Sequence, residues 1–135
     1  EEAKRLYQQS IAAEPNNPKG HYELGSLCLS IGKAEEAVFS LERAIALQPN
    51  YVEALNNLGS ALEELGEIHR AISCYNKALD FDQNCVKAHF NLGLALLLTG
   101  DLPRGFAAYA GGGAGGHCDR CQHLWHDWRS GKHAL

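Results

Sequence analysis

The stretch HCDRCQHLWHDW, from His117 to Trp128, carries residue types that bind metal ions. Cys118 and Cys121 form a C-x2-C pair, a spacing that lets two thiolates reach one ion from a tight turn. His126 follows four residues after the pair, and thiolate and imidazole are ligands that Zn²⁺ accepts. The stretch therefore predicts a Zn²⁺ site made by Cys118, Cys121, His126 and a further histidine: His133, or else His123 or His117.

The zinc pattern is incomplete, so other interpretations of this tail stay open. The stretch resembles the zinc-knuckle pattern C-x2-C-x4-H-x4-C, but Gly131 stands where the last cysteine belongs. The alternatives are a redox-active thiol pair, a disordered tail, or a sequence not native to the domain before it. If the tail is helical, Trp125 and Trp128 with Leu124 could instead cap that domain. The run GGGAGG at 111–116 predicts a flexible linker in front of the tail.

The elements that would position any site come from a 34-residue period in the rest of the chain. Leu-Gly pairs recur in register, and so do single glycines eight residues after each Leu. The pairs are Leu24-Gly25, Leu58-Gly59 and Leu92-Gly93, and the single glycines are Gly32, Gly66 and Gly100. Apolar residues between these marks fall at helical spacing. A repeated pair of short helices cannot bury its own apolar face, so neighbouring pairs must stack.

These residues resemble the tetratricopeptide repeat family, whose unit is a helix-turn-helix of this length. The resemblance covers residues 1 to about 110 and implies an all-α, right-handed solenoid. It divides the chain into a half repeat 1–17, repeats 18–51, 52–85 and an incomplete 86–110, the linker 111–116 and the tail 117–135. Because the chain begins inside a repeat and contains no Met, we expect it to be part of a longer protein.

The pattern predicts helices at about 1–14, 18–31, 34–47, 52–65, 68–82, 86–99 and 101–110. Gly66 ends a helix by allowing a left-handed backbone, and Pro49 keeps one unit from running into the next. One unit later, Gln83 stands at the position of Pro49, which predicts a less sharp junction between those two units. Pro103, Gly105 and the glycines from 111 onward weaken the last helix.

In this family the first helix of each unit lines a concave groove, which implies where a partner would bind. The residues expected to face the groove are Lys19, Tyr22, Glu23, Ser26, Leu29 and Ser30; Glu53, Asn56, Asn57, Ser60, Glu63 and Glu64; and Lys87, Phe90, Asn91, Leu94, Leu97 and Leu98. Asn57 and Asn91 resemble part of an asparagine ladder that would hold a peptide backbone; otherwise they are simply tolerated polar residues. Phe90, Leu94, Leu97 and Leu98 form an apolar stripe, which is either a binding surface or a face covered by the tail or a further repeat.

The charges of this groove indicate which peptides would fit. The family's carboxylate-clamp members grip acidic C-termini with Lys, Asn and Arg, and only Asn57 and Lys87 match that set. Glu23, Glu53, Glu63 and Glu64 add negative charge to the same face. We therefore expect a neutral or basic peptide rather than an acidic one.

Several classes of function are excluded by composition and motifs. The chain has a net charge of −4 and no basic stripe, which argues against nucleic acid, and no apolar run is long enough for a membrane span. It contains no catalytic signature, so we expect no enzymatic activity, and His21 and His89 are expected to be structural. The five scattered cysteines favour a reducing compartment, the cytoplasm.

The leading hypothesis is a scaffold that binds a peptide or partner protein in the groove. Three alternatives remain. The array could be a regulatory or targeting module of a larger enzyme, since GDLPRGFAAY at 100–109 resembles the last repeat before a transferase domain in some bacterial glycosyltransferases. The zinc-binding tail could be the functional element. The chain could also self-associate through its end helices.

Overall fold

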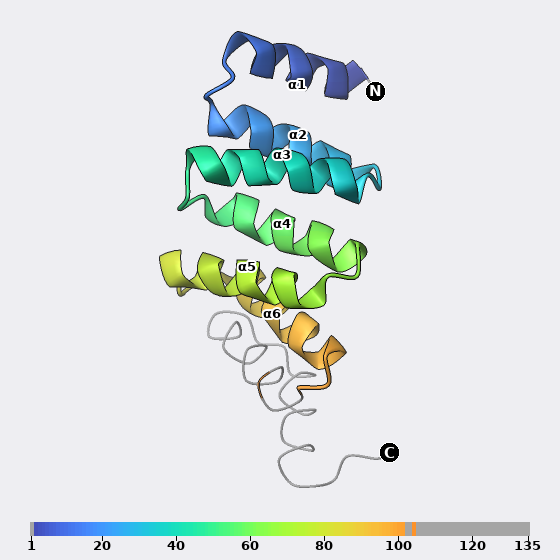
Figure 1. Ribbon diagram of the computed structural model, residues 1–135. Helices are drawn as coiled ribbons and strands as arrows, with labels where there is room; N and C mark the ends of the chain where they lie inside the picture. The colour runs from blue at the N-terminus through green and yellow to red at the C-terminus, as the bar shows by residue number, and fades with distance from the viewer. Residues whose placement is uncertain (1, 102–103, 105–135) are drawn as a thin grey trace, which may run out of the picture.

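The computed structural model describes residues 2–101 and 104, and the described part forms six α-helices and no strand. The helices follow one another in a single stack, with alternating direction (Figure 1). They are α1 (Glu2–Ala13), α2 (Pro18–Ser30), α3 (Ala34–Leu47), α4 (Val52–Glu64), α5 (Ile68–Phe81) and α6 (Val86–Leu98). This confirms the predicted all-α solenoid, while most of the helix predicted at 101–110 lies outside the described residues.

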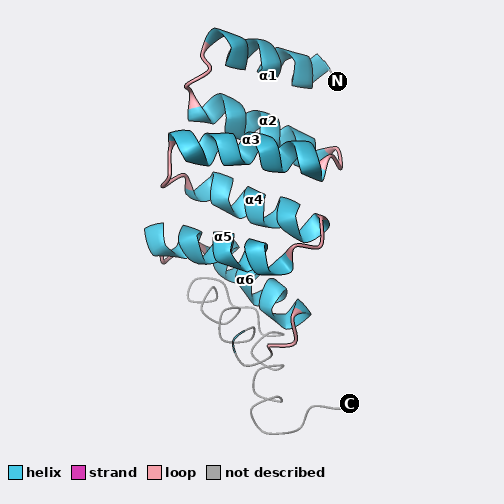
Figure 2. Cartoon of the chain, viewed as in Figure 1, coloured by secondary structure: helices cyan, strands magenta, loops and turns pink. Residues whose placement is uncertain are grey.

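Each helix packs on the next one in the chain, and the even-numbered helices also contact each other, α2 with α4 and α4 with α6. Within the described residues, α1, α3 and α5 make no comparable backbone contacts with one another. The odd- and even-numbered helices therefore form two layers of the stack (Figure 2). We call the side lined by α2, α4 and α6 the even-helix face. Contacts that stay between neighbouring units are typical of a solenoid.

A glycine with positive φ ends the first helix of every unit, as the sequence predicts. The φ angles are +82°, +81° and +84° at Gly32, Gly66 and Gly100. In the second unit the Gly66 amide donates to the Glu63 carbonyl oxygen (3.0 Å), and the Glu67 amide donates to the Leu62 carbonyl oxygen (2.8 Å). These are the two bonds of a Schellman motif, which satisfy carbonyl groups left open at a helix end. The turn therefore fixes the angle between the two helices of a unit.

The junction at Gln83 is as sharp as the junction that contains a proline, so the expectation of a looser turn is wrong. Gln48 has φ −139° and ψ 91°, and the equivalent Asp82 has φ −141° and ψ 93°. The Asp82 carboxylate accepts a hydrogen bond from the Asn84 amide at 3.1 Å. An aspartate can form a turn in this way without proline.

The two equivalent histidines hold the junctions in front of their helices. His21 Nε2 donates to the Pro15 carbonyl oxygen at 2.9 Å, and His89 Nε2 donates to the Gln83 carbonyl oxygen at 2.8 Å. A carbonyl oxygen can only accept, so Nε2 carries the proton in both rings. These bonds confirm the structural role predicted for both residues.

The small residues of the repeat let the two helices of each unit approach closely. Leu41 of α3 lies on Gly25 of α2, and the Tyr75 ring of α5 lies on Gly59 of α4. A Cβ atom at either glycine would overlap the side chain that lies on it. In each of these two units the core therefore includes a matched pair of a glycine and a large side chain. The same pairing brings the Tyr75 ring across the surface of α4.

Candidate interaction face

A line of hydrogen bonds crosses the even-helix face and joins its three helices. Asn57 Nδ2 of α4 donates to Ser26 Oγ of α2 at 2.8 Å. Lys87 Nζ of α6 donates to Asn57 Oδ1 at 3.2 Å. Asn57 is nearly buried, whereas the Lys87 side chain is exposed. One amide thus fixes the positions of a hydroxyl and an ammonium group on neighbouring repeats. All three residues were predicted to face the groove, but their mutual contacts were not.

Asn56 is placed differently from the prediction. Its side chain is 2% exposed, so it lies between the helices and not on the open face. Asn56 Nδ2 donates to the Cys85 sulfur at 3.4 Å. One unit earlier, at the equivalent positions, Tyr22 stacks on Tyr51 with ring centroids 5.0 Å apart. In both units the pair joins a residue of the first helix to the residue just before the first helix of the next unit. Asn56 and Tyr22 therefore occupy a packing position of the repeat.

The acidic residues of the even-helix face differ in burial. Glu23 and Glu63 are half-buried, and Glu64 is exposed. Burial raises the pKa of Glu63 above its ordinary value, and the nearby Tyr75 hydroxyl partly opposes this shift. Ser60, on the same helix, donates its hydroxyl to the Asn56 carbonyl oxygen at 3.3 Å. The face therefore carries carboxyl groups as well as Lys87, the basic end of the hydrogen-bonded line.

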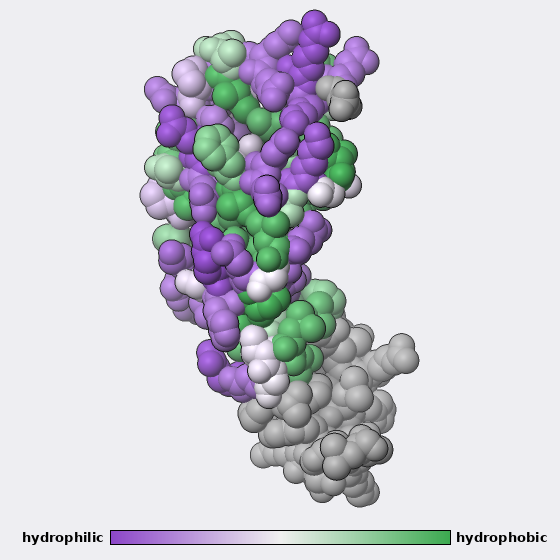
Figure 3. Space-filling model, turned by 45° about the vertical axis from the view of Figure 1, so that its right-hand side comes forward, coloured by the Kyte–Doolittle hydropathy of each residue, from purple (hydrophilic) through white to green (hydrophobic). Residues whose placement is uncertain are grey.

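The α6 end of the face is apolar, as the sequence predicts. Leu98 is 70% exposed, and Phe90 and Leu94 are exposed to a smaller extent. Figure 3 shows apolar side chains gathered at this end of the array, beyond the more polar units before it. Asn91 lies half-buried among them, and its Nδ2 has no hydrogen-bond partner within the described residues. Within the part of the chain that the structure describes, Asn57 is hydrogen-bonded to neighbouring helices and Asn91 Nδ2 is not, so the two do not form equal rungs.

Family models match most of this repeat array. A model described as TPR repeat matches residues 25–66 and 60–100, and a model described as Tetratricopeptide repeat matches residues 6–39. The chain belongs to the tetratricopeptide repeat family. The matched residues include α2, α4 and α6, the helices that line the even-helix face.

Solved structures of MamA share the fold of this tetratricopeptide array. One crystal structure of MamA is 26% identical with a TM-score of 0.87, and the match covers 96% of this chain and 78% of that chain. A second crystal structure of MamA protein is 22% identical with a TM-score of 0.78, covering 99% of this chain and 68% of that chain. No curated protein matches the chain.

Two hollows lie on the opposite side of the array, between odd-numbered helices. One, of about 480 Å³, opens between α1 and α3 over Leu24 and Cys28 of α2. Another, of about 270 Å³, opens between α3 and α5 over Leu58 and Leu62 of α4. The two are equivalent sites one unit apart, and the first is larger where Cys28 replaces the bulkier Leu62.

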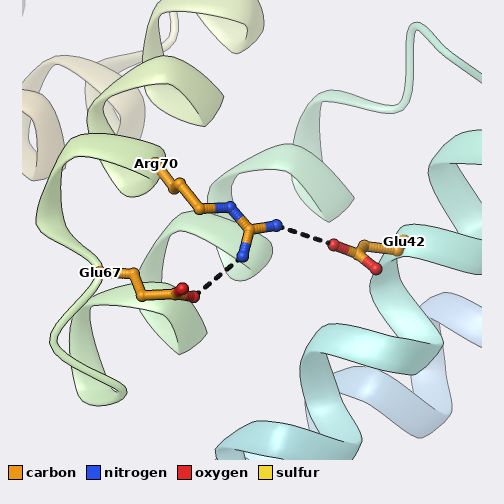
Figure 4. A network of polar contacts seen from close by, with 3 residues as sticks. All are labelled: Glu42, Glu67 and Arg70. Carbon is orange, nitrogen blue, oxygen red and sulfur yellow. Dashed lines mark hydrogen bonds and ion pairs between the residues drawn. The ribbon is translucent and has the colours of Figure 1, made fainter.

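Ion pairs bridge both of these hollows. Arg70 of α5 contacts Glu42 of α3 at 3.2 Å and Glu67 at 2.9 Å, as Figure 4 shows. One unit earlier, Lys4 of α1 contacts Glu36 of α3 at 2.6 Å. Glu36 occupies the position of Arg70, so the sign of the pair is reversed between units. Both ion pairs join odd-numbered helices, whereas the even-helix face has hydrogen-bonding groups on all three first helices.

The predicted zinc ligands Cys118, Cys121, His126 and His133 lie outside the described residues, and the site stays a prediction from the sequence. Among the residues that the structure describes, no group of three His, Cys, Asp or Glu side chains could hold a metal ion. In the same part of the chain, no helix has the length and apolar character needed to cross a membrane.

Proposed function

We propose that this tetratricopeptide array is a non-enzymatic scaffold that binds an extended peptide of a partner protein along the even-helix face. The observation that carries the proposal is the hydrogen-bonded line from Ser26 through Asn57 to Lys87. It holds polar groups of α2, α4 and α6 in fixed positions before any ligand arrives. Preorganised groups lose less conformational entropy on binding, which favours affinity for a peptide that follows the same line.

Asn57 keeps hydrogen-bonding capacity beyond its two internal contacts. A carboxamide has two N–H donors and a carbonyl oxygen with two lone pairs, and each group is used once here. The remaining donor and acceptor can pair with one peptide unit of an extended chain. The half-buried Glu63 and the exposed Glu64 favour a neutral or basic peptide over an acidic one.

The test is a screen of short capped peptides for binding to the purified chain. A double change of Asn57→Ala and Asn91→Ala should weaken the peptides that bind by about tenfold, since each lost hydrogen bond contributes roughly 0.5–1.5 kcal/mol. Asn76→Ala is the matched control, because Asn76 is an exposed asparagine of α5 on the opposite layer. A folded double variant that binds the same peptides with unchanged affinity would overturn the proposal.

The exposed leucines of α6 favour a second candidate function, association with another protein surface or a second copy of this chain. Leu94 and Leu98 leave an apolar area open at one end of the array. A mass that rises with concentration in light scattering, and falls back in a Leu94→Ser/Leu98→Ser variant, would support self-association. A mass that stays monomeric at all concentrations would count against it. Whether the array serves as a module of a larger enzyme would be decided by the parent gene sequence.

A further inference from the structure

Buried polar groups without partners gather where Tyr75 crosses α4. The Tyr75 side chain is fully buried, and its hydroxyl has no hydrogen-bond partner within the described residues. Glu63 Oε1 is likewise buried and unpaired. Ser60 and Glu63 lie near the hydroxyl and both influence its pKa, but neither makes a hydrogen bond of good geometry with it. Buried polar groups are nearly always hydrogen-bonded, so these orphan groups indicate a missing partner.

The position of the cluster follows from the glycine beneath the tyrosine ring. Tyr75 lies directly on Gly59, which allows the ring to pass α4 and brings its hydroxyl to the level of Ser60 and Glu63. In the first unit the residue equivalent to Tyr75 is Leu41, which has no hydroxyl. The second unit therefore presents a polar group where the first has only a hydrocarbon side chain.

Asn91 extends the cluster toward α6. Asn57 donates to Ser26, and the residues one unit later are Asn91 and Ser60. In the second unit this bond is absent, because Ser60 donates to the Asn56 carbonyl oxygen and Asn91 Nδ2 is buried without a partner. The polar line that is closed between α2 and α4 is thus open between α4 and α6.

We propose that Glu63, Tyr75 and Asn91 form a subsite for a cationic side chain, lysine or arginine, of a bound peptide. This rests on the proposed function and names its ligand chemistry. Glu63 supplies the negative charge, and the Tyr75 hydroxyl supplies a second acceptor for the N–H donors of an ammonium or guanidinium group. Asn91 Nδ2 donates to a main-chain carbonyl oxygen of the same peptide residue. Burial of the carboxylate strengthens its attraction to a cation, because the local dielectric is low.

The first experiment uses small probes and needs no known peptide. N-acetyl-arginine amide and N-acetyl-lysine amide are titrated into the full chain, with the neutral N-acetyl-citrulline amide as control, and backbone amide shifts are followed by NMR. We expect saturable shifts at Ser60, Glu63 and Asn91 with at least one cation and none with citrulline. The comparison of arginine with lysine identifies the preferred donor. No saturable shift, or equal shifts with citrulline, would overturn the subsite and leave a bound water as the partner.

Variants separate the subsite from a purely structural role. Tyr75→Phe keeps the ring on Gly59 and removes only the hydroxyl, so the fold is retained, and cation affinity should fall about threefold. Glu63→Gln should lower it about tenfold, because hydrogen bonds to charged groups are the stronger ones. Asp80→Asn, which removes an exposed carboxylate of α5, and Tyr7→Phe, which removes a hydroxyl of α1, should leave it within error, since both residues lie on odd-numbered helices. Folded Glu63→Gln and Tyr75→Phe variants with unchanged affinity would overturn the assignment.

The same variants distinguish failure of the subsite from failure of the proposed function. If peptides from the screen bind without any preference for arginine or lysine and are insensitive to Glu63→Gln, the scaffold function stands and the subsite is wrong. If the small cations bind as expected but no peptide does, the subsite stands and the peptide-binding function is wrong.

Discussion

At the scale of single residues, Glu63 should make the stability of the array depend on pH. Burial raises the pKa of Glu63 above its ordinary value of 4.5, so the folded chain holds this proton more tightly than the unfolded chain does. A group whose pKa is raised on folding makes its full contribution to stability at pH values below its pKa in the unfolded chain. That contribution is lost as pH rises through its pKa in the folded chain. The stability advantage of Glu63→Gln over wild type should therefore grow from about pH 4 upward and then level off.

Denaturant unfolding at a series of pH values measures this difference. Glu64→Gln controls for the loss of one charge from the same helix. Comparison with a variant is needed because other pairs act in the opposite direction: Lys4 lowers the pKa of Glu36, which adds stability as pH rises. A difference between Glu63→Gln and wild type that stays constant with pH would show that the carboxyl is not perturbed.

Tyr75 gives a second prediction at this scale, for stability without ligand. Since its hydroxyl is buried and unpaired, Tyr75→Phe should leave the free energy of unfolding unchanged or raise it by about 1 kcal/mol. Tyr75→Ala should instead cost about 3–5 kcal/mol, because it also empties the space on Gly59. Chemical denaturation of both variants checks this. A loss of about 1 kcal/mol or more in Tyr75→Phe would mean that the hydroxyl has a stabilising partner in the free protein.

Residue positions were the least predictable part of the face. Asn57 and Asn56 are adjacent polar residues, and the sequence gives no means to distinguish them, since both fall on the wide polar side of one helix. In the structure Asn56 donates to Cys85 at the start of α6, whereas Asn57 donates to Ser26 of α2. The role of the Tyr75 hydroxyl was not predicted, because the ring occupies a core position of the repeat and core positions are assigned from apolar spacing alone. Its one sequence signal was the change from Leu41 to Tyr75 between units.

At the scale of helices, the glycine turns allow a test that separates conformation from packing. Gly66 has φ +81° and open space around it, so Gly66→Ala should cost about 1–2 kcal/mol through backbone strain alone. Gly66→Asn should cost less, since asparagine adopts this conformation more readily. Gly59→Ala acts differently, because its Cβ would overlap the Tyr75 ring, and we expect about 1–3 kcal/mol. Thermal melts of the three variants provide the measurement. Equal losses in Gly66→Ala and Gly66→Asn would contradict the conformational explanation.

Helix bounds followed closely from the sequence for the same physical reason. The helices predicted up to residue 99 end within one residue of the observed ends, as at 52–65 against Val52–Glu64, because glycine fixes one end and a turn residue the other. The exception is the junction at Gln83, where the absence of proline predicts a less sharp turn than the structure has. The aspartate just before it forms the turn through its own carboxylate.

The ion pair between α3 and α5 should contribute little to stability. Arg70 and Glu42 are both about half exposed, with relative exposures of 57% and 49%, so water and salt screen their attraction. Arg70→Gln should lower the free energy of unfolding by less than about 1 kcal/mol, and high salt should remove the difference. Urea unfolding at two salt concentrations tests this. A larger loss that persists in salt would mean that the pair sets the position of α5.

At the scale of the whole molecule, the linear arrangement of units predicts that stability is uneven along the stack. Helix α1 has no buried residue and packs only on α2, whereas α4 has eight buried residues and contacts helices on both sides. In a solenoid each unit is stabilised by its immediate neighbours, so units at an end open more easily than those in the middle. Native-state hydrogen exchange should therefore show the lowest opening free energy in α1, an intermediate one in α6 and the highest in α4.

A matched pair of variants ties this gradient to the contacts between neighbours. Lys4→Gln removes the ion pair that joins α1 to α3, and it should speed amide exchange in α1 while leaving α4 unchanged. Leu62→Ala removes a fully buried side chain of α4 and should lower the opening free energy of α4 and of both adjoining helices by about 2–5 kcal/mol. Two results would contradict the nearest-neighbour description: one common opening free energy for all six helices in the wild type, or an equal loss of protection along the stack in Lys4→Gln. Either result would mean that the array unfolds as a single cooperative unit.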